Sequence, residues 1–278
     1  MKSVTPTLNS KFNSALWLSD LHLDKASSQQ IGHLLAHISV TSADCFFITG
    51  DISNARSLTD HLRVIAAACR PRPIFFSTGN HDYYGSSFAH VDAGIGSLCG
   101  AVENLHFLNG QQIIPLNRHT CLIGDRGWPD ARTGYGIHSC LRSPDHSAIN
   151  DFRGFTRQQS MIRMQELGRE SANRIRKVLP LALTRYRHVF LLTHTPPFPE
   201  AVRYNDAPCG PLHLPHYVNL SAGLAIRGIA KAFPSRRITI LAGHSHSSSI
   251  THIGTNICVR VAHARTGRTG PQELLRLT

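Results

Sequence analysis

The sequence contains no apolar run long enough to cross a membrane, and it begins without the apolar core of a signal peptide. The opening residues, MKSVTPTLNSKFNSALWL, have one lysine near the start, no cleavage-like site and no apolar core of about 7–15 residues. A run of about 18 apolar residues, the minimum for a membrane-spanning helix, occurs nowhere. We therefore expect no signal peptide, no membrane span and a cytoplasmic location.

Closely spaced cysteine pairs are also absent. The seven cysteines are odd in number and include no CxxC pair. Zinc sites built from thiolates usually contain such pairs. Cys45, Cys121 and Cys258 lie in apolar, strand-like runs, where a free cysteine behaves as a small hydrophobic residue. The cysteines therefore argue against thiolate-bound zinc and suggest a reducing compartment.

Acidic residues are scarce compared with basic ones. There are 29 lysines and arginines against 17 aspartates and glutamates, so the formal net charge is +12 and the pI is near 9.9. Such a balance favours anionic partners, which include phosphates, nucleic acid and acidic surfaces. The basic residues between 163 and 177 are most simply explained as a solvated helix face. Nucleic acid therefore remains an open partner.

The chain has enough apolar residues to bury a sizeable core. Of its 278 residues, 41% are hydrophobic and 17% are charged, which is typical of globular proteins and not of disordered chains. This length suits one large α/β domain or two small ones. Because no repeat, low-complexity tract or linker divides the sequence, we expect a single domain over residues 1–278.

The first part of the chain alternates between strand-like and helix-like segments. Short apolar runs predict strands at residues 15–19, 44–49 and 73–77. Helical spacing of apolar residues predicts helices at residues 28–40 and 58–69. Strand and helix in strict alternation predict βαβαβ units with right-handed crossovers, and thus an α/β fold.

The middle of the chain is less regular. We expect a hairpin over residues 105–116, turning at Asn109–Gly110, and a strand at 120–124. From residue 125 the composition shifts to Gly, Pro, Ser and charge, so residues 125–155 are predicted to form a loop inserted at the active site. Residues 156–187 predict one long helix or two, with Pro180 as the break.

The strand and helix rhythm then returns. The remaining predicted elements are strands at 189–193, 238–242 and 256–262, the last of the chain, and a helix at 221–232. Polar residues follow five of the predicted strands directly, in the fragments SDLHL, GDISN, GNHD, THTPP and GHSH. Ligands of open α/β sheets bind beyond the carboxyl ends of the strands. These fragments, each weak alone, together predict one shared site.

Two features of the fragments suggest how side chains converge. The i, i+2 spacing within SDLH and GHSH suits an extended backbone, in which alternate side chains point the same way. Gly50, Gly79 and Gly243 directly precede the polar residues, where glycine permits a sharp turn or a close approach of backbone. Each pair, Asp20 with His22 and His244 with His246, is therefore expected to be able to bind one metal ion.

The series DxH, GDxx(N/D), GNH(D/E), H and GHxH resembles the motifs of the calcineurin-like metallophosphoesterase superfamily. The resemblance runs from Asp20 to His246 and includes every metal-binding motif. The GNHD form is most similar to the bacterial branch related to class III cyclic-nucleotide phosphodiesterases. The resemblance implies a βαβαβ sandwich of two mixed β-sheets packed together and flanked by helices. It also implies a metal-dependent phosphoric ester hydrolase, a phosphodiesterase or phosphatase.

The resemblance further implies a dinuclear metal site. Seven side chains would hold two divalent ions: Asp20, His22 and His246 one ion, Asn80, His194 and His244 the other, and Asp51 both. A ligand set of nitrogen and oxygen without sulfur suits Mn, Fe, Zn or Co, of which we favour Mn or Fe. The implied nucleophile is a hydroxide that bridges the two metal ions.

His81 would assist the leaving group in the implied reaction, either by donating a proton to the leaving oxygen or by stabilising charge there. In the protein-phosphatase branch, an aspartate three residues after the bridging aspartate orients this histidine, whereas this sequence has Asn54 there. An amide stabilises imidazolium less than a carboxylate does, so Asn54 favours substrates with a good leaving group. Asp82 is the carboxylate adjacent to His81 in the sequence. A role for Asp82 in a turn or as a helix cap explains its presence at least as well as a role beside His81.

The irregular stretches offer candidate substrate contacts. They are Arg126, Trp128, Arg132 and Tyr135 in the long loop, and Tyr204, Asn205 and His216 further on. Trp128 could stack on a base, but it could equally shield the core of its own loop.

We expect a small phosphoester as substrate, and specifically a phosphodiester such as a cyclic nucleotide. One alternative is a DNA or RNA nuclease, which the charge of +12 supports. Others are a phosphomonoesterase or protein phosphatase, and a non-catalytic binding scaffold, which the presence of His81 disfavours. The sequence leaves the oligomeric state open.

Overall fold

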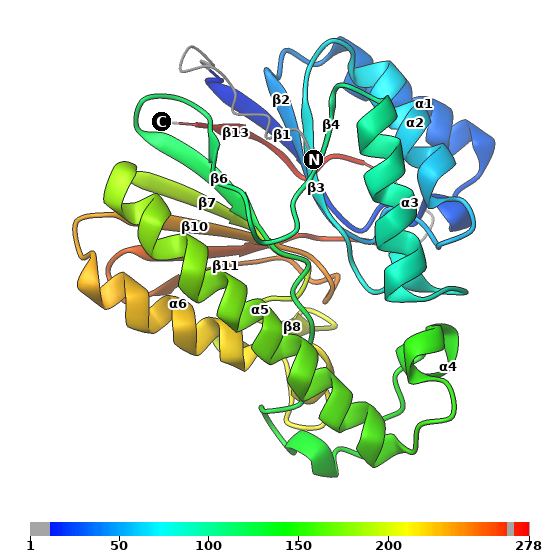
Figure 1. Cartoon of the computed structure of the whole chain (residues 1–278), viewed down its shortest axis with the longest axis vertical. Helices are drawn as coiled ribbons and strands as arrows, with labels where there is room; N and C mark the ends of the chain where they lie inside the picture. The colour runs from blue at the N-terminus through cyan, green and yellow to red at the C-terminus, as the bar shows by residue number, and fades with distance from the viewer. Residues whose placement is uncertain (1–11, 266–269, 278) are drawn as a thin grey trace.

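Two β-sheets lie face to face between layers of helices in the computed structural model, which describes residues 12–265 and 270–277 (Figure 1). The first sheet has the strand order β13-β1-β2-β3-β4. Its strands β1 to β4 run parallel, and β13 pairs antiparallel with β1. The bounds are Ser14–Leu18 (β1), Cys45–Thr49 (β2), Ile74–Ser77 (β3), Leu105–Phe107 (β4) and Glu273–Arg276 (β13).

The second sheet has the order β11-β12-β10-β7-β6-β5, and a two-stranded hairpin, β8-β9, stands apart from it. Its four central strands are parallel, and β11 and β5 are antiparallel edges. The bounds are Ile114–Pro115 (β5), Thr120–Gly124 (β6), His188–Leu192 (β7), Arg203–Tyr204 (β8), Ala207–Pro208 (β9), Arg237–Ala242 (β10), Ser249–Ile253 (β11) and Ile257–Val261 (β12).

Helices cover the outer face of each sheet (Figure 1). The first sheet carries α1 (Ser28–Val40), α2 (Leu58–Cys69) and α3 (Phe88–Ala101), and the second carries α5 (Arg157–Arg185) and α6 (Leu220–Ala232). The short elements are η1 (Leu23–Lys25), η2 (His81–Tyr83), η3 (Gly136–His138), α4 (Asp145–Ala148), η4 (Asn150–Phe152), η5 (Pro199–Ala201) and η6 (Leu214–His216). No helix within the described residues is long and apolar enough to span a membrane.

The alternation of side chains along each strand builds this layered core. In β1, Leu16 and Leu18 pack with the helices of the first sheet, whereas Ala15 and Trp17 lie between the two sheets. Strands buried on both faces read as continuous apolar runs because alternate side chains enter different layers. The predicted α/β class and the implied sandwich of two mixed sheets flanked by helices are therefore confirmed.

The predicted hairpin over residues 105–116 is wrong. β4 pairs in parallel with β3 of the first sheet, and β5 pairs antiparallel with β6 of the second. The chain does turn around Gly110, whose φ is +82°. At this turn it passes from the first sheet to the second and does not fold back on β4. Local turn chemistry marks where a chain changes direction but not which strand it pairs with afterwards.

Several other boundaries differ from expectation. Of the two alternatives for residues 156–187, one helix is correct: it runs from Arg157 to Arg185 without the break expected at Pro180. The strands β11 and β13 and the helix α3 were not predicted, so the strand at 256–262 is not the last. Three glycines inside α3 weaken its intrinsic helix propensity. It is nevertheless helical because Phe88, Val91, Ile95 and Leu98 are buried in the core shared with the first sheet.

The buried carboxylate of Asp125 fastens the end of β6 to α5. It accepts hydrogen bonds from the backbone N–H of Gly127 at 2.9 Å, from the hydroxyl of Ser171 and from the guanidinium of Arg174. Burial by itself raises the pKa of Asp125, but the interactions with Arg174 hold the pKa below its ordinary value. A carboxyl group with a lowered folded pKa stabilises the fold above its unfolded pKa of about 4, and this contribution is lost as the pH falls through the folded pKa.

We therefore expect Asp125→Asn to lower the free energy of unfolding by about 3 kcal/mol at pH 7. The gap to the wild type should shrink as the pH falls below about 4, because the unfolded wild-type chain then takes up a proton at Asp125 that the folded chain does not. The gap closes below the lowered folded pKa, where the group is uncharged in both states. Urea unfolding with excess chelator at a series of pH values measures the gap. The control is Asp60→Asn, whose exposed pair with Arg63 should contribute less than about 1 kcal/mol. A gap that stays constant from pH 7 to pH 3 would contradict this account.

Candidate metal centre

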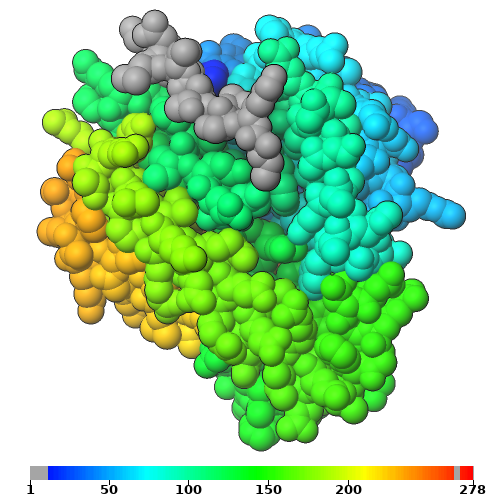
Figure 2. Space-filling view, viewed as in Figure 1, coloured from blue at the N-terminus to red at the C-terminus, as the bar shows by residue number. Residues whose placement is uncertain are grey.

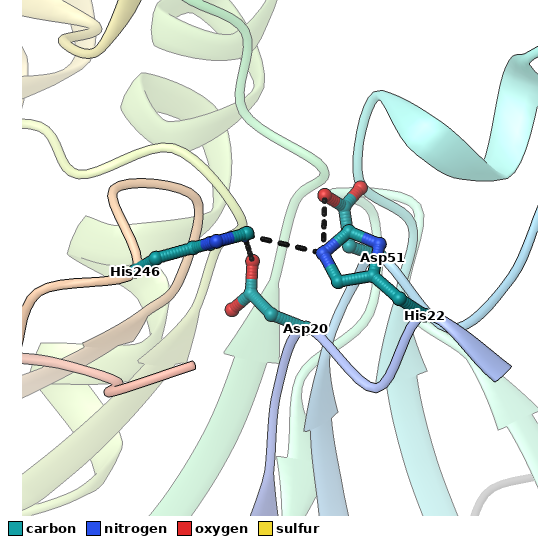
Figure 3. Close-up of side chains that lie close together, drawn as sticks. All are labelled: Asp20, His22, Asp51 and His246. Atoms are coloured by element: carbon teal, nitrogen blue, oxygen red, sulfur yellow. Dashed lines mark hydrogen bonds and ion pairs between the residues drawn. The ribbon is translucent and has the colours of Figure 1, made fainter. Parts of the chain in front are cut away.

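The polar fragments that follow β1, β2, β3, β7 and β10 meet at one edge of the sandwich, between the two sheets. Figure 3 shows four of their side chains pointing toward one another: Asp20, His22 and Asp51 from the first sheet and His246 from the second. Asp20, His22 and Asp51 are at most 2% exposed. The expectation that distant fragments converge on one site holds for these four residues.

The backbone at these residues is unusual. Asp20, His22, Asp51, His244 and His246 have φ values between 43° and 72°, in the left-handed region. This conformation costs a non-glycine residue about 1–3 kcal/mol, so it persists only where surrounding contacts enforce it. The extended backbone expected from the i, i+2 spacing is therefore wrong: each loop turns sharply directly after its strand.

Glycines next to the polar residues let the two sheets approach closely. A Cβ atom at residue 79 would lie 2.3 Å from Oδ1 of Asp51 and 2.7 Å from Cε1 of His194. A Cβ atom at residue 243 would lie 2.1 Å from Oδ2 of Asp20. Gly50 has a φ of +92°. The expected close approach at Gly79 and Gly243, and the sharp turn at Gly50, are thus confirmed.

One group of four predicted ligands has the spacing that a single ion requires. Nε2 of His246 lies 3.2 Å from Nε2 of His22 and 3.4 Å from Oδ1 of Asp20. Nε2 of His22 lies 3.8 Å from Oδ2 of Asp51. All four ligand atoms fall within 4.8 Å of one another. Atoms bound about 2.1 Å from one metal ion lie roughly 3–4 Å apart, so this group could hold an ion.

A second group meets on the other oxygen of Asp51. Nε2 of His194 lies 3.4 Å from Oδ1 of Asp51 and 3.1 Å from Oδ1 of Asn80. The rings of His194 and His244 have their centroids 5.0 Å apart. Asp51 thus lies between both groups, which is the arrangement that the family resemblance implies.

Hydrogen bonds on the far side of two rings determine which nitrogen faces the centre. Nδ1 of His194 donates to the carbonyl of Thr49 at 2.8 Å, and Nε2 of His244 donates to the carbonyl of His216 at 2.8 Å. A carbonyl oxygen only accepts, so these nitrogens carry the protons. In the neutral form of each ring, the opposite nitrogens, Nε2 of His194 and Nδ1 of His244, carry the lone pairs that face the centre, as in metal-binding histidines of many proteins.

The charges of the centre favour a bound cation. Burial alone raises the pKa of the Asp20 carboxyl, but His246 and His194 hold it at about 2, and His194 and His81 hold the pKa of Asp51 well below its ordinary value. Burial lowers the pKa of His194, yet Asp51 raises it to about 10. Two charged carboxylates in a buried place thus draw positive charge toward them, and a divalent ion supplies it.

Two other histidines suit metal binding because they are neutral. Burial lowers the pKa of both His22 and His244 to about 4, and only a neutral imidazole offers a lone pair to a metal ion. Nδ1 of His22 is also buried without a hydrogen-bond partner among the described residues. The chemistry, burial and orientation of these side chains fit divalent metal ions.

His81 lies beside both groups. Its backbone N–H donates to Oδ1 of Asp51 at 2.8 Å, its ring centroid is 4.6 Å from that of His22, and its other face stacks on Tyr84 at 4.2 Å. Asn54 instead bonds to Asp24 and accepts from the N–H groups of residues 56 and 57. Within the described residues no hydrogen bond joins Asn54 to His81. Asn54 holds the turn that precedes α2, whose N-cap is Ser57, and its predicted orienting role stays a prediction.

The structure gives Asp82 a clear part in the local fold. Its buried carboxylate accepts hydrogen bonds from the backbone N–H groups of Gly79, Ile52 and Ser53 at 2.8–2.9 Å. It therefore ties the loop after β3 to the loop after β2, which carries Asp51. The turn predicted from sequence corresponds to the local hydrogen bond with Gly79. The hydrogen bonds with Ile52 and Ser53 join separate loops and depend on the tertiary structure.

A cavity of about 530 Å³ opens over the centre. Asp51, Asn80 and His244 lie at its base, and of the candidate substrate contacts Tyr204, Asn205 and His216 line it. The predicted insertion also contributes, through residues 141–144. The candidate contacts predicted from sequence did not include several lining residues: Tyr84, Arg142, His213, Tyr217, His263 and Arg265.

The other predicted contacts lie elsewhere in the described structure. Arg126 bonds to the hydroxyl of Tyr83 at 2.9 Å and pairs with Asp92 at 3.3 Å. Trp128 is 2% exposed and packs among core aromatic rings, the alternative weighed for it above. Arg132 and Tyr135 are exposed and do not appear among the described residues that line the cavity.

A family model described as calcineurin-like phosphoesterase matches residues 14–248, which is most of the chain. No curated protein matches the sequence. Among solved structures, a phosphopantetheinyl hydrolase from Mycobacterium tuberculosis is similar, with a TM-score of 0.63, 12% identity and coverage of 93% of this chain and 92% of the other.

Two further structures are similar over most of their length. TT1561 of Thermus thermophilus has a TM-score of 0.60 and 12% identity, with coverage of 96% of this chain and 95% of the other. A dimetal phosphatase from Danio rerio has a TM-score of 0.59 and 12% identity, with coverage of 96% and 93%. At this identity the likeness concerns the fold.

Proposed function

Because the chain belongs to the calcineurin-like phosphoesterase family and is thus a metal-dependent phosphoester hydrolase, we propose that it hydrolyses phosphodiesters, such as cyclic nucleotides, at a two-metal centre. In this proposal Asp20, His22 and His246 hold one ion, Asn80, His194 and His244 hold the other, and Asp51 contacts both. Mn and Fe are the favoured metals among those that suit nitrogen and oxygen ligands.

The single observation that most supports this proposal is the position of Asp51. One of its oxygens lies 3.8 Å from His22 and the other lies 3.4 Å from His194. A carboxylate with one oxygen toward each group is the arrangement that two neighbouring ions need. Such ions, when bound, polarise a phosphoryl oxygen and activate a water molecule for attack at phosphorus.

The protein's own residues would orient the substrate and move a proton. The His81 ring, held between Tyr84 and His22, is placed to donate a ring N–H proton to the leaving oxygen. The backbone N–H of His81, bonded to Asp51, keeps that ring next to the centre. Asn54 bonds elsewhere, so His81 is expected to serve good leaving groups best.

The cavity supports a small organic ester as substrate. An aromatic wall, formed by Tyr217, Tyr204 and His213, leads away from His244 with centroid distances of 5.1, 6.0 and 4.1 Å between neighbouring rings. Planar groups such as bases stack on rings of this kind. A bare phosphate would leave most of the wall uncovered.

The nuclease alternative rests on the basic charge, and the structure accounts for part of it. On α5, Arg163 pairs with Glu166 and Glu170, and Arg174 pairs with Asp125. Partly neutralised arginines attract a polynucleotide less strongly than free ones. We therefore place the small diester ahead of DNA or RNA.

Hydrolysis of bis-p-nitrophenyl phosphate after loading with Mn tests the proposal. We expect turnover that depends on Mn and exceeds turnover of the monoester p-nitrophenyl phosphate. Cyclic nucleotides and single- and double-stranded DNA complete the panel, with binding to DNA measured over a range of salt concentrations. A protein that binds two metal ions but turns over no diester, or that cleaves DNA in preference, would overturn the proposal.

A further inference from the structure

A buried carboxylate from the insertion lies directly behind the centre. Asp145, the first residue of α4, is 4% exposed. Its Oδ1 accepts from the amide nitrogen of Asn80 at 2.8 Å and from the hydroxyl of Tyr84 at 2.6 Å. Within the described residues it forms no ion pair with a lysine or arginine.

We propose that Asp145 is a positioning residue, which holds the oxygen of the Asn80 amide toward the second metal and, through Tyr84, holds the ring of His81. The inference rests on the proposed function, because it assigns the second metal to Asn80. It also gives the insertion at residues 125–155 a specific role, namely to complete the support of that ligand.

The chemistry of a carboxylate sets the orientation of the amide. An amide has a donating end and an accepting end of nearly the same shape, and only the oxygen is a good metal ligand. An ionised carboxylate only accepts, so the NH₂ end of Asn80 must face Asp145. The oxygen then lies 3.1 Å from Nε2 of His194, on the side of the centre. A flipped amide would bring two acceptors to about the same 2.8 Å separation, which is repulsive.

Tyr84 extends the same control to His81. Its hydroxyl donates to Asp145 and accepts from the amide nitrogen of Asn80 at 3.2 Å, which closes a ring of hydrogen bonds. Its aromatic ring stacks on His81 with 29° between the planes. One carboxylate therefore restrains both a predicted metal ligand and the predicted proton donor.

Docking of the insertion does not depend on this carboxylate. The backbone N–H of Gly85 donates to Ala148 at 2.7 Å, and that of Asn150 donates to Ser86 at 2.8 Å. Asp151 accepts from the N–H of Phe88 at 2.8 Å. Figure 2 shows the insertion, in green, packed against the segment that contains α3, in cyan. Burying a carboxylate is costly, and the two donors that Asp145 meets both belong to the centre.

The test compares Asp145→Asn with Asp151→Asn, which makes the same change of charge in the same insertion without touching Asn80. Each protein is equilibrated with increasing Mn, and bound Mn is counted by elemental analysis. Electron paramagnetic resonance separately distinguishes coupled pairs from isolated ions. We expect the wild type and D151N to bind two ions equally well. In D145N one ion should bind as in the wild type and the other about 10–100-fold more weakly, as when partners behind a ligand are removed.

Equal binding of both ions by D145N and the wild type would overturn the inference, as would equal weakening in D145N and D151N, because docking alone would then explain the effect. If D145N does not fold, Tyr84→Phe carries the test. Loss of this hydroxyl should weaken the same ion about 2–10-fold and leave the other unchanged, and any other pattern overturns the inference. A wild type that binds no Mn refutes the proposed function itself. If the wild type binds two ions and hydrolyses diesters, the proposed function stands, and the variants then test only the role of Asp145.

Discussion

Replacing Asp51 with asparagine is expected to reduce phosphodiester turnover by at least about 10³-fold, which corresponds to roughly 4 kcal/mol of transition-state stabilisation. Asp51 faces His22 with one oxygen and His194 with the other, and it accepts the backbone N–H of His81. An amide in its place carries no charge and offers one oxygen instead of two. The variant should therefore lose at least one of two bound metal ions.

The measurement pairs Mn content with the turnover of bis-p-nitrophenyl phosphate. Asp44→Asn is a matched control, because Asp44 precedes β2 at the opposite end from Asp51 and binds the backbone N–H groups of residues 13 and 14. The control should keep both ions and the wild-type rate. If D51N kept two ions and full activity, the assignment of a shared carboxylate would be refuted.

Replacing His81 with alanine is expected to lower kcat by about 10²–10⁴-fold while both metal ions stay bound. The ring of His81 faces the cavity and is not one of the proposed ligands. Loss of a proton donor matters most when the leaving group is a poor one. The deficit should therefore be small for p-nitrophenolate and large for alkyl alcohols, across a series of diesters.

His90→Ala is the control for this variant, because His90 is exposed on α3. It should leave kcat unchanged for every diester in the series. A deficit in H81A that is the same for all leaving groups would show that His81 binds substrate and does not donate a proton. Loss of metal from H81A would instead place His81 in the metal centre.

Much of the centre could be predicted because its residues follow strands in the sequence. Asp20 comes directly after β1, Asp51 after β2, and His194 after β7. A short apolar run followed by a polar fragment is a local pattern, and parallel strands bring their carboxyl ends to one edge. Local pattern and sheet geometry together therefore placed side chains that are far apart in the chain.

The errors arose where long-range contacts outweigh local preference. β4 and β5 were predicted as one hairpin but join different sheets, because pairing depends on which strand edge lies free nearby. One long helix or two, broken at Pro180, were the alternatives for residues 156–187, and α5 is the single helix, which continues through Pro180 while packed in the core with α6. Proline lacks one hydrogen bond, and buried apolar contacts along α5 offset that loss.

The sequence by itself determined the α/β class, the family and the identity of the residues after each strand, because these depend on local periodicity and on motifs of a few residues. Only the tertiary structure decided how those residues are held. It placed five of them in left-handed backbone conformations, and it brought Asp145, which belongs to no motif, to the amide of Asn80. Contacts of this kind join segments 65 residues apart, and no local pattern encodes such a separation.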